Sequence, residues 1–189
     1  MTFDRRALRE AGRELVVLDR AIYTAVHATP SPVIDHAVAR ISRAADRSGL
    51  WLALAAGMSL LGERPRRAAV VGVTSLGFTS AVVNLAVKPL VRRERPSRLE
   101  TVRTHVVRMP TSASYPSGHT ASAFAFSTAV GGGVPELDTA LRLAATVVGY
   151  SRVHTGVHYP GDVIAGAVIG AGVGTLARHL ARRIGFVPH

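Results

Sequence analysis

The chain has no cysteine, a single lysine and few charged residues. Of its 189 residues, 19% are charged and 48% are hydrophobic. The absence of cysteine excludes a disulfide scaffold, thiol redox chemistry and any cysteine-based metal site. The large hydrophobic fraction excludes intrinsic disorder, because burying so much apolar surface offsets the entropy of ordering the chain. All 23 basic residues are arginine except Lys88, so this lysine requires an explanation.

A net charge of +11 on so apolar a chain fits two classes of protein: a nucleic-acid binder with a large core, or a membrane protein with basic flanks. The distribution of charge decides between them. Ala68–Val87 contains twenty consecutive uncharged residues, which is the length that a bilayer span needs. Shorter uncharged runs cover Ser48–Gly62, Thr120–Pro135 and Val163–Ala177. Several such runs, separated by short charged loops, indicate a helical membrane protein.

The expected fold is all-α, a membrane-embedded bundle of about five or six helices with amphipathic helices at its N-terminus. Gly166, Gly170 and Gly174 fall at four-residue intervals in the last helix, which predicts a small-residue face for close helix packing. The helices of the bundle are expected at Ser48–Gly62, Ala68–Leu90, His119–Gly132, Thr139–Arg152 and Gly161–Arg183.

Residues 1–47 are expected to form an N-terminal interfacial region ahead of the transmembrane domain at 48–189. Leu15, Leu18 and Ile22 recur at helical spacing, with arginine and glutamate on the opposite face. This pattern predicts an amphipathic helix that lies on the membrane surface or packs on the bundle. Proline breaks the chain at Pro30, and a second amphipathic stretch is expected over Val33–Ala45.

Chemically active side chains cluster at the ends of the expected helices. Because antiparallel neighbours are joined by short loops, the end of the second bundle helix, the start of the third, the end of the fourth and the start of the fifth lie on one side of the membrane. This alternation brings together Lys88, Arg95, His119, Arg152, His158 and Asp162.

Such a cluster suits phosphoryl transfer. Three cations match the charge of a phosphate, and arginine binds its oxygens bidentately. The helix that starts after Gly118 adds free backbone N–H groups and a favourable dipole. Asp162 follows His158 by four residues, so its carboxylate can accept the imidazole N–H and fix the tautomer. The arrangement describes transfer through a phosphohistidine, with no metal required.

Three short blocks of this sequence resemble, in order, the signature of the type 2 phosphatidic acid phosphatase family. The superfamily also includes the soluble vanadium haloperoxidases. The resemblance covers about residues 68–177 and leaves the N-terminal third unassigned. The blocks are Lys88-x6-Arg95-Pro96, Pro116-Ser117-Gly118-His119 and Ser151-Arg152-x5-His158-x3-Asp162.

The resemblance implies a role for each matching residue. His158 would attack phosphorus, Asp162 would orient it, and His119 would protonate the leaving oxygen and later help to activate water. A bell-shaped pH–rate profile set by the two histidines as a pair is expected. No metal or other cofactor is implied. The residues expected to bind the phosphate oxygens are Lys88, Arg95, Ser117, Gly118 and Arg152.

The expected function is therefore that of a multi-pass cell-membrane phosphatase acting on a lipid phosphomonoester or diphosphate. Candidate substrates are phosphatidic acid, phosphatidylglycerophosphate, polyprenyl diphosphates and polyprenyl-linked sugar phosphates. The expected partners are this lipid substrate and the membrane, with no nucleic acid. The arginine distribution favours neither orientation in the membrane, and the sequence does not indicate an oligomeric state.

Two alternatives use these residues differently. The same site would serve a phosphoryl transferase, or a vanadate haloperoxidase, although the apolar spans argue against the second. A non-enzymatic basic membrane protein that binds anionic lipid or nucleic acid is the other alternative. Two groups of side chains are expected to lie outside the site. One is a solvated loop that contains Arg92, Arg93, Arg98, Arg103 and Arg108. The other is the remaining histidines, namely His27, His36, His105, His154, His179 and His189.

Overall fold

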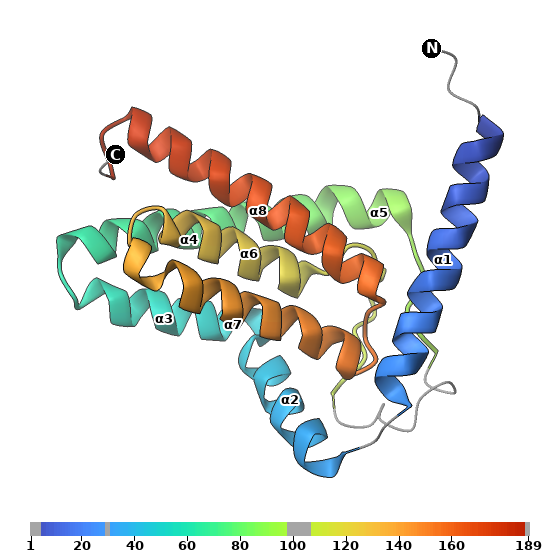
Figure 1. The fold of residues 1–189 in the computed structure, drawn as a ribbon. Helices are drawn as coiled ribbons and strands as arrows, with labels where there is room; N and C mark the ends of the chain where they lie inside the picture. The colour runs from blue at the N-terminus through green and yellow to red at the C-terminus, as the bar shows by residue number, and fades with distance from the viewer. Residues whose placement is uncertain (1–4, 29–30, 98–106, 188–189) are drawn as a thin grey trace.

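The structure, a computed structural model, describes residues 5–28, 31–97 and 107–187. Over this part of the chain the fold is an all-α bundle, as the sequence predicts. Helix α6 (Gly118–Gly131) lies at its centre. Around it pack α4 (Glu63–Val82), α7 (Pro135–His154) and α8 (Pro160–Arg183), while α3 (Gly49–Ser59) packs against α4 (Figure 1).

Helix α6 is central because its sequence is made almost wholly of small or apolar residues. Every α6 residue from Thr120 to Gly131 is buried except Phe124, which is partly buried. The ring of Phe126 packs against that of Trp51 on α3, with 5.4 Å between the centroids. Burial of this apolar surface, together with the close packing that small residues allow, stabilises the bundle.

The predicted small-residue face on the last helix is confirmed. Gly166, Gly170 and Gly174 are buried on α8 and face the backbone of α6. A Cβ atom at Gly170 would overlap the carbonyl oxygen of Ala121. The two helices therefore approach more closely than any other residue type would allow.

Within the described residues, two helical segments are long and apolar enough to cross a bilayer. Glu63–Val91 and Pro160–Arg183 have apolar windows that are only 33% and 17% buried within the protein. The core helix of a soluble protein would be mostly buried, whereas these segments expose large apolar side chains such as Phe78, Leu85 and Val168. Their outer faces suit lipid, as expected for a membrane protein.

The first of these segments is one continuous helix with an irregular turn. After α4, a π-helical turn, η2 (Val83–Val87), leads directly into α5 (Lys88–Val91). A π turn widens the helix locally, and such turns are frequent at functional sites. It brings Lys88 to the end of the apolar segment.

The N-terminal region forms two helices followed by a short turn. These are α1 (Arg5–His27), α2 (Pro32–Ala44) and the 3-10 turn η1 (Asp46–Ser48). Helix α1 lies beside the end of the bundle where α8 begins (Figure 1), and Tyr23 is buried there against Tyr159, with ring centroids 5.3 Å apart. The rest of α1 exposes a run of apolar side chains, namely Leu15, Val16, Val17, Leu18 and Ile22.

The helix boundaries differ from expectation mainly at two helix starts. Helix α4 begins at Glu63 and not at Ala68. Helix α7 begins at Pro135 and not at Thr139. Proline is favourable in the first turn, where its missing N–H costs nothing, and Glu136 and Asp138 interact favourably with the helix dipole. Proline and acidic residues ahead of an apolar run therefore extend the helix by one turn.

Candidate active site

Four helix termini meet at one end of the bundle and enclose a cavity of about 250 Å³. Lys88 comes from the start of α5, Gly118 and His119 from the start of α6, and His158 from the loop that joins α7 to α8. Arg95 reaches the cavity from the segment after α5. These five predicted residues all line the cavity, in agreement with the alternation of helix ends.

The imidazole of His158 is held on both of its nitrogens. Its Nδ1 lies 3.3 Å from Asp162 Oδ2, and its Nε2 lies 3.2 Å from Arg95 Nη1. A proton on Nδ1 donated to the carboxylate leaves the lone pair on Nε2 beside the guanidinium. The residue lines the cavity although it is only 1% exposed. This tautomer is the one in which Nε2 acts as a nucleophile.

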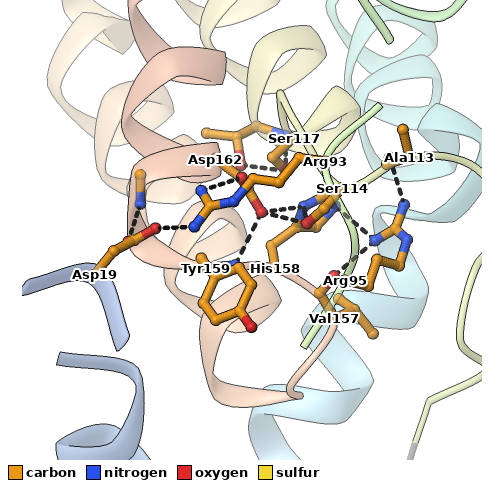
Figure 2. A network of polar contacts seen from close by, with 12 residues as sticks. Asp19, Arg93, Arg95, Ala113, Ser114, Ser117, Val157, His158, Tyr159 and Asp162 are labelled. Carbon is orange, nitrogen blue, oxygen red and sulfur yellow. Dashed lines mark hydrogen bonds and ion pairs between the residues drawn. The ribbon is translucent and has the colours of Figure 1, made fainter. Parts of the chain in front are cut away.

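Asp162 is completely buried at the start of α8 and is held by several donors (Figure 2). Its Oδ2 accepts hydrogen bonds from the Tyr159 backbone N–H, at 3.0 Å, and from the Ser114 hydroxyl. Its Oδ1 lies 2.9 Å from Arg93 Nη1. A buried carboxylate with these partners has a fixed position, so it holds the His158 ring in one orientation.

Burial lowers the pKa of His158 from its ordinary 6.5 to about 3, although the hydrogen bond to Asp162 acts in the opposite direction. The positive charges of Arg95 and Arg152 add to the lowering. The imidazole is therefore neutral at physiological pH, which is the state that nucleophilic attack requires.

The two cations of the first block are held by one serine. Arg95 donates from Nε to the backbone oxygen of Ser112 at 2.9 Å and from Nη1 to that of Val157 at 2.6 Å. Lys88 Nζ lies 3.2 Å from Ser112 Oγ. Ser112 thus fixes both side chains with their positive charge directed at the cavity, where a phosphate would be attracted.

The start of α6 contributes a histidine and a glycine to the cavity. Gly118 lines the cavity, and a Cβ there would lie 3.8 Å from Lys88 Nζ. Ser117 is the N-cap of α6, and its hydroxyl accepts a hydrogen bond from Thr120 Oγ1 at 2.9 Å, so its side chain serves the helix. Ser117 is not among the residues that line the cavity, and its expected contact with phosphate stays a prediction.

Arg152 lies behind the cavity instead of lining it. The side chain is 1% exposed, and its Nη1 donates to Ser42 Oγ on α2 at 2.5 Å. The same nitrogen lies 3.8 Å from Asp46 Oδ1, and this oxygen also contacts His119 Nε2 at 2.9 Å. Among the described residues, Arg152 Nε has no hydrogen-bond partner. An unsatisfied buried donor on a cation is consistent with a site for an anion.

The expectation that Arg93 belongs to a solvated loop is wrong. Its guanidinium lies between Asp162 and Asp19, with Nη2 2.6 Å from Asp19 Oδ2. It also stacks 4.4 Å from the centre of the Tyr159 ring (Figure 2). Its position two residues before Arg95 gives no sign of this, because adjacent loop residues have no fixed direction. Of the other loop arginines, Arg92 and Arg108 are exposed as expected. Arg98 and Arg103 fall outside the described residues.

None of the other histidines that the structure describes takes part in this cluster. His27 and His36 contact backbone oxygens of their own helices, and His154 pairs with Asp35 of α2 at 2.8 Å. His179 is exposed on α8, and His105 and His189 fall outside the described residues. Within the described ranges, no three His, Asp or Glu side chains are grouped as metal ligands.

Comparisons with known proteins relate this chain to one superfamily. The model of the PAP2 superfamily matches residues 68–185. Decaprenylphosphoryl-5-phosphoribose phosphatase of Mycobacterium tuberculosis is 35% identical over 130 residues, which cover 67% of this chain and 68% of that protein. Undecaprenyl-diphosphatase of Sulfolobus acidocaldarius is 34% identical over 140 residues, which cover 69% and 63%.

A solved structure has the same fold. The transmembrane PAP2 type phosphatidylglycerolphosphate phosphatase of Bacillus subtilis superimposes with a TM-score of 0.73 at 24% identity, covering 90% of this chain and 88% of that one. The alignment therefore extends beyond the region matched by the family model. At this identity the likeness concerns the fold alone.

Proposed function

Since the chain belongs to the PAP2 superfamily, whose members named above are lipid phosphatases, we propose that it hydrolyses a lipid phosphomonoester or diphosphate through a phosphohistidine on His158. The observation that carries this proposal is the pair of contacts on one imidazole. Nδ1 lies 3.3 Å from Asp162 Oδ2, while Nε2 faces Arg95 at the cavity. A neutral, oriented and buried imidazole beside a guanidinium is arranged to attack an anionic phosphorus.

In the first step, the Nε2 lone pair forms a bond to phosphorus as the bond between phosphorus and the leaving oxygen breaks. His119, in its protonated form, gives its proton to that oxygen. Asp162 stabilises the positive charge that develops on His158. Lys88 and Arg95 offset the charge on the phosphoryl oxygens, and Arg152 is the third cation of this group.

In the second step, water attacks the phosphohistidine. His119, now neutral, accepts a proton from the water as the new oxygen–phosphorus bond forms. The nitrogen–phosphorus bond breaks, its electron pair returns to Nε2, and inorganic phosphate leaves. Both steps use side chains of this chain alone, so activity is expected to persist in the presence of a chelator.

The placement in the membrane is also a proposal. The chain is inserted in the cell membrane as a multi-pass protein, with residues 48–189 as its catalytic domain. Helices α1 and α2 lie at the interface, where the exposed apolar run on α1 meets lipid and its arginines meet anionic headgroups. The lipid tail of the substrate remains in the bilayer while its phosphate enters the cavity.

The test is phosphate release by the purified full chain in detergent micelles. Phosphatidic acid, phosphatidylglycerophosphate and prenyl diphosphates form the panel, and wild type is compared with His158→Ala. His179→Gln is the matched control, because His179 is exposed on α8 roughly 25 Å along the helix from Asp162. We expect activity in wild type and control and none in His158→Ala.

Three outcomes contradict the proposal. Persistent activity in His158→Ala removes the phosphohistidine mechanism. Transfer of the phosphoryl group to an added alcohol in preference to water makes the protein a transferase. Failure of wild type to release phosphate from any lipid, with retained binding to anionic vesicles, makes it a non-enzymatic lipid binder.

A further inference from the structure

The turn η1 meets the start of α6 through one contact between an aspartate and a histidine. Asp46 Oδ1 lies 2.9 Å from His119 Nε2. The turn packs against α2, α3 and α6, so a residue of the N-terminal region is brought beside the proposed general acid. Asp46 falls outside residues 68–185, which the PAP2 superfamily model matches. The match to the family therefore assigns no role to this carboxylate.

The contact determines which nitrogen of His119 is available to a substrate. Nε2 is the nitrogen that Asp46 contacts, and the imidazole makes no other hydrogen bond within the described ranges. Nδ1 is therefore the nitrogen that can donate a proton to a leaving oxygen in the cavity, which His119 lines. An imidazole with a carboxylate on one nitrogen and the substrate on the other is arranged to transfer a proton.

Asp46 reaches His119 from outside the cavity. Its neighbours Ala45 and Arg47 line the cavity, whereas Asp46 is not among the lining residues. The same Oδ1 lies 3.8 Å from Nη1 of Arg152, the cation behind the cavity. The carboxylate is thus outside the space that a phosphate would occupy. This placement suits a residue that orients the imidazole and not one that binds the substrate.

Asp46 also favours the charged form of His119. Burial lowers the pKa of His119, and the positive charges of Arg152 and Lys88 lower it further, whereas the contact with Asp46 raises it. A general acid must carry its proton before it can donate it. The carboxylate therefore stabilises the protonated imidazole that the first step of the reaction requires.

The backbone of η1 is strained directly after Asp46. Arg47 and Ser48 have φ of 51° and 61°, and neither is glycine. Consecutive left-handed residues are unfavourable and are found where the surrounding structure requires them, often at functional sites. The ion pair itself adds little to stability, because the Asp46 side chain is 46% exposed and exposed pairs are weak. Loss of this carboxylate is therefore expected to affect the histidine more than the fold.

We propose that Asp46 is a positioning residue for His119, which holds Nε2 so that Nδ1 donates the proton to the leaving oxygen. This proposal rests on the proposed function, which makes His119 the general acid. In the first step the bond between Nδ1 and its hydrogen breaks, and the proton passes to the leaving oxygen as the phosphorus–oxygen bond breaks. The hydrogen on Nε2 stays on the ring and remains bonded to Asp46.

The test compares two phosphomonoesters whose leaving groups differ in their need for a proton. The alkoxide that leaves phosphatidic acid must be protonated, whereas the phenolate that leaves 4-nitrophenyl phosphate departs without a proton. The quantity measured is kcat/KM, which reports the steps up to release of the leaving group. For Asp46→Asn we expect a fall of roughly 10- to 100-fold on phosphatidic acid. On 4-nitrophenyl phosphate we expect a change within about threefold.

Two further variants identify the route by which Asp46 acts. Asp46→Glu keeps the carboxylate and is expected to recover part of the activity on phosphatidic acid. His119→Asn removes the acid and is expected to lose about 10²- to 10⁴-fold on the same substrate. The double variant, Asp46→Asn with His119→Asn, is expected to lose no more than His119→Asn alone, because Asp46 acts through His119.

The matched control is a second aspartate–histidine pair of the same region. Asp35 Oδ1 of α2 lies 2.8 Å from His154 Nε2, and neither residue lines the cavity. We expect Asp35→Asn to leave the ratio of the two kcat/KM values unchanged. A loss that comes only from disturbed packing would lower both values together, so the ratio separates positioning of the acid from damage to the fold.

Three kinetic results overturn the proposal and leave the phosphatase function intact. An equal loss on both substrates, or no loss on either, shows that Asp46 does not serve the general acid. Losses that multiply in the double variant show that Asp46 acts by a route other than His119. A rise in kcat/KM in Asp46→Asn shows that the contact with His119 inhibits the enzyme.

A measurement without turnover separates this proposal from the proposed function. Nitrogen-15 NMR of histidine-labelled protein in detergent reports the tautomer of each imidazole, and His119→Asn identifies the signal of His119. In a His158→Ala background we expect neutral His119 to carry its proton on Nε2, and Asp46→Ala to remove this preference. A proton on Nδ1, or the same tautomer with and without Asp46, overturns the proposal whether or not wild type hydrolyses any lipid.

Discussion

Arg93 Nη1 lies 2.9 Å from Asp162 Oδ1, and through this contact the N-terminal helix reaches the carboxylate beside His158. The other end of the guanidinium lies 2.6 Å from Asp19 Oδ2 on α1. Asp19 Oδ1 in turn accepts the backbone N–H of Gly161, at 2.6 Å, in the first turn of α8. One aspartate of α1 therefore holds both the arginine and the helix start that position Asp162.

This relationship predicts that Arg93 and Asp19 act by positioning. We expect Arg93→Gln and Asp19→Asn each to lower kcat by roughly 10- to 100-fold with little change in KM, the range typical of partners that orient a functional ligand. Arg93→Lys is expected to recover part of the activity. Steady-state kinetics on one lipid phosphate provide the measurement.

Arg92→Gln is the matched control, because Arg92 is exposed and, among the residues that the structure describes, donates only to the Pro89 backbone oxygen. A rise in KM without a change in kcat would instead show that Arg93 binds substrate. A double variant, Asp19→Asn with Arg93→Gln, is expected to lose less than the product of the two single losses, since both act through Asp162.

Replacing Asp162 itself is expected to be far more damaging. The Asp162→Asn substitution keeps the shape of the side chain but removes the charge that holds the Nδ1 proton of His158, so the wrong tautomer becomes accessible. In a comparable histidine–aspartate pair this loss lowers kcat by roughly 10⁴-fold, and we expect Asp162→Asn to lose about 10³- to 10⁴-fold. Single-turnover formation of the phosphoenzyme is the measurement.

Asp138→Asn serves as the control for Asp162→Asn, because Asp138 forms only a surface ion pair with Arg142 of its own helix. A phosphoenzyme that forms at the wild-type rate in Asp162→Asn would refute the role of the carboxylate.

The pH dependence of activity follows from the state of His158. Burial lowers its pKa to about 3, so the imidazole stays neutral and reactive as pH falls through its ordinary 6.5. We expect the acid limb of kcat/KM that belongs to the enzyme to lie well below pH 6.5. Burial, aided by the positive charge of Arg152, lowers the pKa of His119 to about 4, although its contact with Asp46 acts in the opposite direction. The alkaline limb, which reports deprotonation of His119 in the free enzyme, is therefore also expected on the acid side of pH 6.5. The two limbs give a bell-shaped profile.

Substrate ionisation is separated from this limb by a second substrate. A phosphomonoester has its own pKa of about 6, so profiles are compared for phosphatidic acid and a prenyl diphosphate. A limb common to both belongs to the enzyme. A common acid limb at 6.5 would contradict the assignment of a buried neutral nucleophile.

The sequence predicted the bundle well because two strong signals agree along it. Uncharged runs located the helices, and alternation of their ends brought Lys88, Gly118, His119 and His158 to one cavity. The uncharged runs are local, and the alternation depends only on the order of the helices. Both can therefore be read from the sequence without knowing how the helices pack. The four-residue glycine spacing on α8 is of the same kind, since it defines one helix face.

The contacts that sequence reasoning missed all depend on packing between distant segments. Arg93 meets Asp19 across 74 positions, and His119 meets Asp46 across 73. Asp19 and Asp46 resemble any other acidic residue of an amphipathic region, and nothing in their spacing points to the cavity. The direction of a loop side chain such as Arg93 is set by the helices around it, which periodicity does not encode.

The close packing of α8 on α6 gives a stability prediction with an internal control. Gly170→Ala places a methyl group against the Ala121 carbonyl, whereas nothing lies within 4 Å of a Cβ at Gly172. Overpacking of this kind costs about 1–3 kcal/mol, and each kcal/mol corresponds to roughly 2–4 °C in a chain of this size. We expect Gly170→Ala to melt several degrees below wild type in detergent, and Gly172→Ala to melt at the wild-type temperature or slightly above, since alanine favours the helix.

Equal melting temperatures for the two variants would show that the α6–α8 interface adjusts without cost. Because α8 carries Asp162 at its start, the Gly170→Ala variant is also expected to lose phosphatase activity at temperatures where the Gly172→Ala variant retains it.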